Sequence, residues 1–231
     1  MLLLGIDLET TGTDIESDEI IEIAGVAWDS FRNAPLKIVS ELIIPQRKQL
    51  NRKISHLTGI EPPDLRNFGV HQEEVLMQIS QMAKKCSYFV GHNGFFFDKP
   101  LLERAFLQHG MKIPKLKWID TAFDIPYPEG IVTRKLNYLA AEHEIIPLFK
   151  HRALFDILAT LKILSKYELD EILEISESPF VTVVADVSYA KRNQAAELGF
   201  IWNPEEKFWA KKTRELIAER ARYPFKTKKI L

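Results

Sequence analysis

Two patterns of apolar residues alternate along the chain, and each predicts a different kind of element. Short runs rich in branched apolar residues predict strands, whereas apolar residues recurring every three or four positions predict helices with one apolar face. Three strand patterns come first, with no helical pattern between them, which favours a meander. We expect these strands over residues 2–9, 20–28 and 36–44.

Helical and strand patterns then alternate, as is typical of an α/β protein. Residues 51–70 are polar and include Gly59, Pro62 and Pro63, so a loop region is predicted there. Beyond it, helices are expected over residues 72–85, 99–109, 135–143 and 152–167, and short strands over 88–91 and 117–119.

The charge balance changes near Ser176 and suggests a second unit. Residues 1–175 contain 20 Lys and Arg against 25 Asp and Glu, whereas the remainder contains 11 against 7. We predict an α/β domain over residues 1–175 and a small basic α+β module over residues 179–231. Its expected elements are a strand over 181–187, a helix over 189–198, two short strands around the Asn203-Pro204 turn, and a helix over 213–222. Its terminal lysines, in 226–229, are expected to form a solvated, frayed end.

Composition indicates a globular protein of a reducing compartment. With 231 residues, 46% of them hydrophobic, the chain can bury a substantial core, and its net charge of -1 is not that of a polybasic or acidic tail. Cys86 is alone in the sequence, so no internal disulfide can form. The apolar run at the N-terminus is too short for a signal peptide or a membrane span. We therefore expect a cytoplasmic protein with no membrane partner.

Two carboxylates directly follow the first apolar run, in the stretch GIDLETTGTD. Asp7 and Glu9 are two positions apart, so in a strand their side chains point to the same face. Carboxylates held so close repel each other and raise a pKa, unless a shared proton or a hard divalent cation relieves the repulsion. An isolated D-x-E pattern, however, is more often an acidic strand end that faces solvent.

Two later segments add further acids and a histidine. Asp98 ends the stretch GHNGFFFD at the start of an expected helix, where it would also suit an N-terminal cap. In HRALFD, five helical residues turn through about 500°, so His151 and Asp156 would not share a helix face. We expect His151 in the loop or first turn and Asp156 on the helix body. Asp156 lies among apolar residues, which is an unfavourable place for a charge without a role.

Three short motifs of the chain resemble, in the same order, the three exonuclease motifs of the DEDDh, or DnaQ-like, 3′-to-5′ exonuclease family. They are D-x-E-T-T-G, H-N with F-D, and H-x-A-x-x-D. The resemblance covers about residues 1–166. It implies a ribonuclease-H-like fold with a five-stranded mixed sheet flanked by helices, here followed by the small α+β module. It also implies hydrolysis from the 3′ end with release of nucleoside 5′-monophosphates. Three residues separate H-N from F-D, a spacing that resembles the three-prime repair enzymes of the family.

The resemblance also assigns roles to individual residues. The four metal-binding acids of the family fall on Asp7, Glu9, Asp98 and Asp156, and its general base falls on His151. The implied cofactors are two divalent ions, Mg²⁺ or Mn²⁺, which lie about 3.5–4 Å apart in such sites. Substrate contacts are expected at Thr10, Thr11, Gly12, Leu57, Thr58, His92, Asn93 and Phe97.

The expected partner is a nucleic acid with a 3′ end. HRALFD followed by a long helix resembles the exodeoxyribonuclease members of the family, so single-stranded DNA is the first choice of substrate. The sequence identifies no polymerase or repair partner. An exoribonuclease would share every motif, because acceptance of a 2′-hydroxyl depends on details of the pocket. A catalytically inactive nucleic-acid-binding subunit is a further alternative, and the intact set of catalytic positions argues against it.

Aromatic and basic residues are interleaved in the module, in the stretch ELGFIWNPEEKFWAKK. Such a mixture is typical of surfaces that stack bases and contact the phosphates of a single strand. More often, however, the tryptophans of such a small module form its core, because it has little else to bury. The residues concerned are Trp202, Phe208 and Trp209 with Lys207, Lys211 and Lys212.

Overall fold

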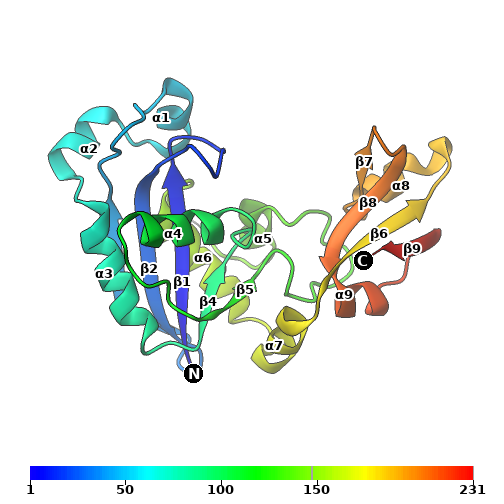
Figure 1. The fold of residues 1–231 in the computed structure, drawn as a ribbon. Helices are drawn as coiled ribbons and strands as arrows, with labels where there is room; N and C mark the ends of the chain where they lie inside the picture. Colours follow the sequence, from blue (N-terminus) through cyan, green and yellow to red (C-terminus); the bar gives the residue numbers. More distant parts are fainter. Residues whose placement is uncertain (147, 231) are drawn as a thin grey trace.

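The computed structural model describes residues 1–146 and 148–230. Its N-terminal part is built on a five-stranded sheet, in which β1 (Leu2–Thr10) is the central strand (Figure 1). It pairs antiparallel with β2 (Ile20–Asp29), which pairs antiparallel with β3 (Ala34–Leu42). On its other side, β4 (Tyr88–Gly91) is parallel to β1, and β5 (Lys117–Asp120) is parallel to β4. The sheet order is β3-β2-β1-β4-β5, and both the predicted meander and the predicted mixed sheet are confirmed.

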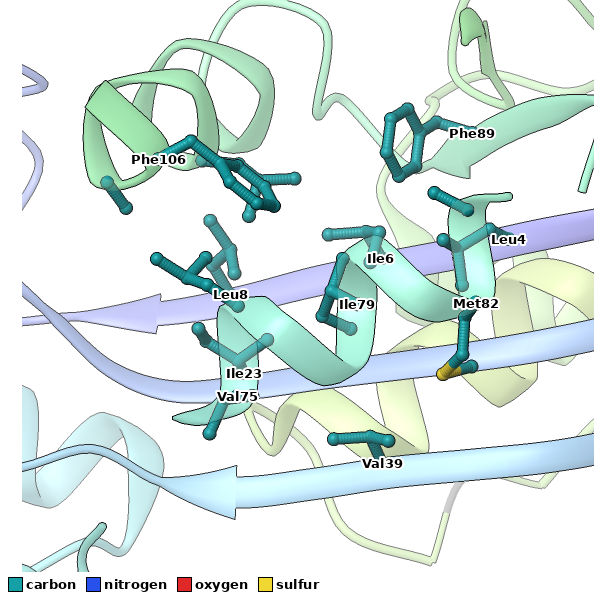
Figure 2. Close-up of a cluster of buried hydrophobic side chains, with 14 of the residues drawn as sticks. Leu4, Ile6, Leu8, Ile23, Val39, Val75, Ile79, Met82, Phe89 and Phe106 are labelled. Carbon is teal, nitrogen blue, oxygen red and sulfur yellow. The ribbon is translucent and has the colours of Figure 1, made fainter. Parts of the chain in front are cut away.

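Helices cover both faces of this sheet. Leu4, Ile6 and Leu8 of β1 point to one face, where α3 (Gln72–Ala83) and α4 (Asp98–Gln108) supply the other half of the core (Figure 2). The opposite face is covered by α5 (Leu136–Glu142), α6 (Ala153–Leu164) and α7 (Leu169–Glu177). The pleat of β1 therefore sends Asp7 and Glu9 to the face covered by α6.

The loop predicted over residues 51–70 is wrong, because two short helices form there. These helices are α1 (Arg52–Thr58) and α2 (Pro62–Phe68). Asn51 caps α1 by accepting the Ile54 N–H at 3.0 Å, and Gly59 ends it with a left-handed φ of 70°. Residues that suggested a loop thus serve as helix start and stop signals. The helices pack on β2 through a small core of Ile21, Ile54, Ile60 and Leu65.

Residues beyond Pro179 form a second, four-stranded antiparallel sheet (Figure 1). It contains β6 (Phe180–Asp186), β7 (Ile201–Asn203), β8 (Phe208–Arg214) and β9 (Lys226–Ile230) in the order β7-β8-β6-β9. A 3₁₀ turn (Tyr189–Lys191), α8 (Arg192–Glu197) and α9 (Glu215–Arg220) complete this module. The frayed end expected over 226–229 is wrong, since β9 pairs along β6.

The boundary between the two units remains a prediction at residues 175–179. In the structure α7, which the sequence reading missed, ends at Glu177, and β6 begins at Phe180. Among the described residues, none of the helices is long and apolar enough to span a membrane.

Candidate active site

Three elements bring the predicted acids together at the C-terminal end of β1. Asp7 and Glu9 project from β1, and Asp98 is the first residue of α4. The Oδ1 atom of Asp98 accepts the Leu8 N–H at 2.9 Å. Because Leu8 lies between the two strand acids, this bond holds Asp98 beside both of them, although it is 90 positions away in the sequence.

His151 and Asp156 complete the cluster from the start of α6. His151 lies just before the helix with a left-handed φ of 55°, and its backbone N–H donates to Asp156 Oδ2 at 2.9 Å. One potential ligand atom from each of Glu9, His151 and Asp156 lies within 4.8 Å of the other two. The expected placement of His151 outside the helix body, with Asp156 inside it, therefore agrees with the structure.

The acids of this cluster strongly perturb one another's protonation. Burial, followed by the nearby Asp98 and Glu9 carboxylates, raises the pKa of Asp7 well above its ordinary value. Burial and the Asp156 carboxylate raise the pKa of Glu9 to about 8. Burial also raises the pKa of Asp98 to about 7 and that of Asp156 above its ordinary range. Packing acids in this way is favourable only when a proton or a cation neutralises them.

The donor set of this cluster fits a hard divalent cation. Carboxylate oxygens are the ligands that Mg²⁺ and Mn²⁺ prefer, and four acids converge here. Arg152, which precedes α6, pairs instead with Glu22, with Nη2 and Oε1 2.8 Å apart. No ion pair to the four acids is formed in residues 1–146 and 148–230. A metal would therefore add positive charge to the partial compensation that Arg152 gives Glu9 and His151 gives Asp156.

Glu22 is a buried acid that the sequence reading missed. It lies opposite Glu9 in the β1–β2 pairing and is 2% exposed. Its carboxylate accepts hydrogen bonds from the Arg152 guanidinium and from the Ala153 N–H at 2.9 Å. It thereby fixes the start of α6, directly after His151. A single acid inside the apolar run of β2 was the signal that could have revealed it.

Asp120 was also missed and shapes the loop that precedes α4. This carboxylate is fully buried at the end of β5 and accepts the N–H groups of Asn93 and Phe95 at 2.8 and 2.9 Å. Burial raises the pKa of Asp120 to about 6. The loop between β4 and α4 is thus held by an acid from the neighbouring strand.

A pocket of about 710 Å³ opens over the cluster. Of the expected substrate contacts, His92, Asn93 and Phe97 line it, and Phe123 and Arg134 are lining residues that were not expected. The Nε2 atom of His92 donates to the Arg134 carbonyl at 2.7 Å, and Nδ1 lies 2.8 Å from the Thr121 hydroxyl. Burial lowers the pKa of His92 to about 4, so its ring is neutral near pH 7.

The other expected substrate contacts are not among the described residues that line this pocket. Thr10 and Thr11 are buried, and the Thr11 hydroxyl donates to Asp18 Oδ1 at 2.8 Å. Gly12 packs against the Asp18 carboxylate so closely that no Cβ would fit. Thr58 is 3% exposed, and its hydroxyl bonds within the end of α1, whereas Leu57 is exposed on the same helix. The side chains of Thr10, Thr11 and Thr58 therefore serve the local fold.

The fold and the acid cluster define a class of nuclease-like α/β proteins, and comparison with known families agrees. Residues 4–164 match the RNase_T family, described as exonuclease. The chain belongs to this exonuclease family, and the predicted resemblance to DnaQ-like exonucleases is confirmed. Residues 181–230 match a separate family, described as a domain of unknown function (DUF8626).

Individual relatives share the exonuclease part of the chain. The 3′-5′ exonuclease DinG of Staphylococcus aureus is 31% identical over 161 residues, which are 69% of this chain and 17% of DinG. The PolC-type DNA polymerase III of Ureaplasma parvum is 30% identical over 139 residues, which are 60% of this chain and 9% of the polymerase. The chain thus spans less than a fifth of the length of either curated relative.

Solved structures show that the fold is shared with exonuclease I. Escherichia coli exonuclease I in complex with a dT13 oligonucleotide has a TM-score of 0.65 and 17% sequence identity. The match covers 85% of this chain and 50% of exonuclease I. The ribonuclease-H-like sheet expected from the sequence is therefore confirmed as the fold of this chain.

Proposed function

We propose that this protein is a metal-dependent 3′-to-5′ exonuclease that hydrolyses single-stranded DNA to nucleoside 5′-monophosphates. The observation that carries the proposal is the convergence of Asp7, Glu9, Asp98 and Asp156 on one pocket, where none of them forms an ion pair within the described part of the chain. Membership in the exonuclease family supports the reaction class. A relative named 3′-5′ exonuclease and a fold shared with an oligonucleotide-bound exonuclease I support the polarity and the single-stranded DNA substrate.

Asp7, Glu9, Asp98 and Asp156 are the residues that would hold two Mg²⁺ or Mn²⁺ ions. When bound, such ions make water more acidic and neutralise charge on the attacking and leaving oxygens of a phosphodiester. Backbone hydrogen bonds hold two of these carboxylates in place: the Leu8 N–H orients Asp98, and the His151 N–H orients Asp156. The carboxylates are thus preorganised before any ligand arrives.

His151 is the proposed general base. Its backbone is outside α6, and its ring lies near the carboxylates of Glu9 and Asp156 at the mouth of the pocket. An imidazole titrates close to neutral pH, so a ring nitrogen can accept the proton of the attacking water. Glu22 acts on this residue indirectly, because it anchors Arg152 and Ala153.

The terminal nucleotide is proposed to enter the pocket between Asn93, Phe97 and Phe123, all of which line it. Phe97 and Phe123 offer apolar surface to a base, and Arg134 and Lys135, directly before α5, carry charge suited to phosphate. The predicted contact at Leu57 remains a prediction, as do contacts through the backbone of the Thr10–Gly12 turn.

End-labelled oligonucleotides test the activity and its polarity. With Mg²⁺ or Mn²⁺, the wild-type chain should release a labelled mononucleotide from 3′-labelled single-stranded DNA and shorten 5′-labelled DNA stepwise. EDTA and the Asp7→Asn substitution should each lower the rate by at least about 1,000-fold. The control Asp170→Asn changes an exposed acid of α7 and should have no effect. A circular strand has no end, so internal products from circular DNA would contradict exonucleolytic cleavage.

Matched RNA and DNA strands test the substrate choice. Faster loss of the RNA would favour an exoribonuclease instead. Binding without hydrolysis of either strand would favour the alternative of an inactive nucleic-acid-binding subunit.

The His151→Gln variant tests the general base. It should lower kcat by about 100-fold to 10,000-fold with little change in KM, because a proton acceptor is lost while the pocket remains. The control His109→Gln changes an exposed histidine that bonds Gln72 outside the site. An unchanged kcat in His151→Gln would refute the assignment.

A further inference from the structure

The four-stranded sheet of the C-terminal module has one covered and one uncovered face. Val181, Val183 and Ala185 of β6 point toward α8 and α9 and form the core of the module with them. The alternate residues of β6 therefore point the other way, to a face that none of the described helices of the module covers. We call this second surface the open face.

Strand register identifies the residues of the open face. Val184 lies opposite Lys228 on β9 and opposite Ala210 on β8, and Ala210 lies opposite Ile201 on β7. Cross-strand partners share a face, so this row crosses the whole sheet. The residues of the open face used below are Val184, Ile201, Phe208, Lys212, Lys226 and Lys228.

The open face combines apolar surface with lysines, and the exposed Asp186 lies opposite Lys226 on it. Ile201 is 76% exposed, and Phe208 is half-buried beside it. No ion pair involves Lys212, Lys226 or Lys228 in the described residues. By contrast, Lys229 points to the covered face, where it pairs with Glu215 and Glu219.

The aromatic and basic residues for which the sequence left open a stacking platform or a core are divided between the two faces. Trp202 and Trp209 lie opposite each other, and Trp209 packs against the core of the module. The Lys211 ammonium donates to the Leu198 carbonyl at 2.9 Å, also on the covered side. Phe208 and Lys212 are the members of this set that lie on the open face.

The base of the open face adjoins the candidate active site. Phe180, at the start of β6, packs its ring 5.5 Å from that of Phe123, which lines the active-site pocket. Phe96 also contacts Phe180, with 5.2 Å between ring centroids, and Lys212 Nζ lies 3.8 Å from the centre of the Phe96 ring. Aromatic and basic groups thus continue from the pocket onto the sheet. Figure 1 shows β6 and β8 leading away from the five-stranded domain at this junction.

A cavity of about 460 Å³ marks the far end of the same sheet. Val184, Phe208, Lys226 and Lys228 of the open face line it at the end of the sheet, together with covered-face residues that include Ala185, Trp202, Trp209 and Thr227. It therefore offers apolar walls for a base and ammonium groups for a phosphate in one place.

We propose that the open face binds the single-stranded segment that precedes the 3′ end held in the active-site pocket. Bases would pack on Phe208 and Ile201, and phosphates would contact Lys212, Lys226 and Lys228. Stacking and phosphate contacts of this kind bind single strands with little sequence preference. The direction of the strand rests on the proposed exonuclease function, whereas binding to the face does not.

Fluorescence anisotropy tests the proposal. The probe is a labelled oligothymidylate of about 15 nucleotides, which is longer than a typical single-strand binding site. The full chain carries Asp7→Asn so that the oligonucleotide is not degraded. Adding Lys226→Glu and Lys228→Glu should weaken binding about tenfold. It should also lower the slope of log Kd against log salt by about 1.4, for two lost phosphate contacts. Phe208→Ala should weaken binding about fivefold at unchanged salt slope.

Lys84→Glu with Lys85→Glu is the matched control. These exposed lysines follow α3, near the start of β1 and thus at the opposite end from the acids, and their reversal changes the net charge equally. Equal affinity in the control and in both open-face variants would overturn the proposal, as would absence of binding by the parent chain. Hydrolysis of a dinucleotide by the wild-type chain measures the proposed function separately.

Discussion

At the scale of single residues, the charged forms of the candidate metal ligands lower the stability of the metal-free fold. Glu9 has a pKa near 8, mainly because burial disfavours its charge, and the Asp156 carboxylate adds repulsion. Its ordinary pKa is 4.5. In the metal-free chain, the folded state therefore keeps a proton that the unfolded state releases as the pH rises above 4.5.

The sign of the pH dependence follows from this difference. The contribution of Glu9 to stability is fully present below pH 4.5 and is lost as the pH rises to about 8. In EDTA, Glu9→Gln should therefore be more stable than the wild-type chain at pH 8, by on the order of 2 kcal/mol, and nearly equal to it at pH 4. Urea unfolding at both pH values measures the difference.

Glu129→Gln changes an exposed loop acid and is the control for this prediction. Its stability should follow that of the wild-type chain at both pH values. A Glu9→Gln variant less stable than wild type at pH 8 would contradict the assigned electrostatics.

At the scale of elements, the close approach of α6 to β1 places Asp156 beside Asp7. Gly5 makes this approach possible, since a Cβ there would lie 2.7 Å from Ile157 Cγ1 and 2.8 Å from Leu161 Cδ1. Both side chains are fully buried in the core beneath α6. The glycine that begins the GIDLET stretch is thus part of how the site is built, although it bears no reactive group.

Gly5→Ala should lower the free energy of unfolding by about 2 kcal/mol, because a methyl group in this packed contact forces α6 outward. Adding Ile157→Ala opens space for that methyl group. The double variant should lose less stability than the sum of the two single variants, by at least about 0.5 kcal/mol. Urea unfolding of all four chains completes the cycle, and strict additivity would show that the two positions do not meet.

Local signals were sufficient for the five-stranded sheet but not for every other element. Runs of branched apolar residues bounded by turn signals revealed the strands of the five-stranded sheet, since these signals depend on neighbouring residues. The polar segment after Asn51 was misread because Gly59, Pro62 and Pro63 can either break a helix or delimit one. Strand β9 was misread because its lysine-rich pattern becomes a strand only by pairing with β6.

At the scale of the whole molecule, a buried ion pair joins the module to the exonuclease domain. Arg214 Nε on β8 lies 2.6 Å from Asp124 Oδ1, and the two side chains are 6% and 0% exposed. The Arg214 guanidinium also lies 3.9 Å from the centre of the Phe180 ring. The position of the open face relative to the active site depends on this contact.

Arg214→Ala should destabilise the chain by about 3–5 kcal/mol, because it removes the cationic partner of the buried Asp124 carboxylate and leaves it only the Asp120 N–H. Arg220→Ala is the control: its partners Glu171 and Glu174 are exposed, so its loss should cost less than about 1 kcal/mol. Urea unfolding gives both values, and limited proteolysis between α7 and β6 reports whether the module separates. Equal stability of the two variants would contradict a coupling role for Arg214.

The sequence by itself determined which residue types the candidate site contains and much of its local geometry. The two-residue spacing of Asp7 and Glu9 and the position of His151 before α6 follow from backbone periodicity, which needs no distant contact. Tertiary structure alone decided which further groups join them. Glu22 meets Glu9 through strand register, and Arg214 meets Asp124 across 90 positions of chain. Such contacts depend on how whole elements pack, which the order of residue types does not record.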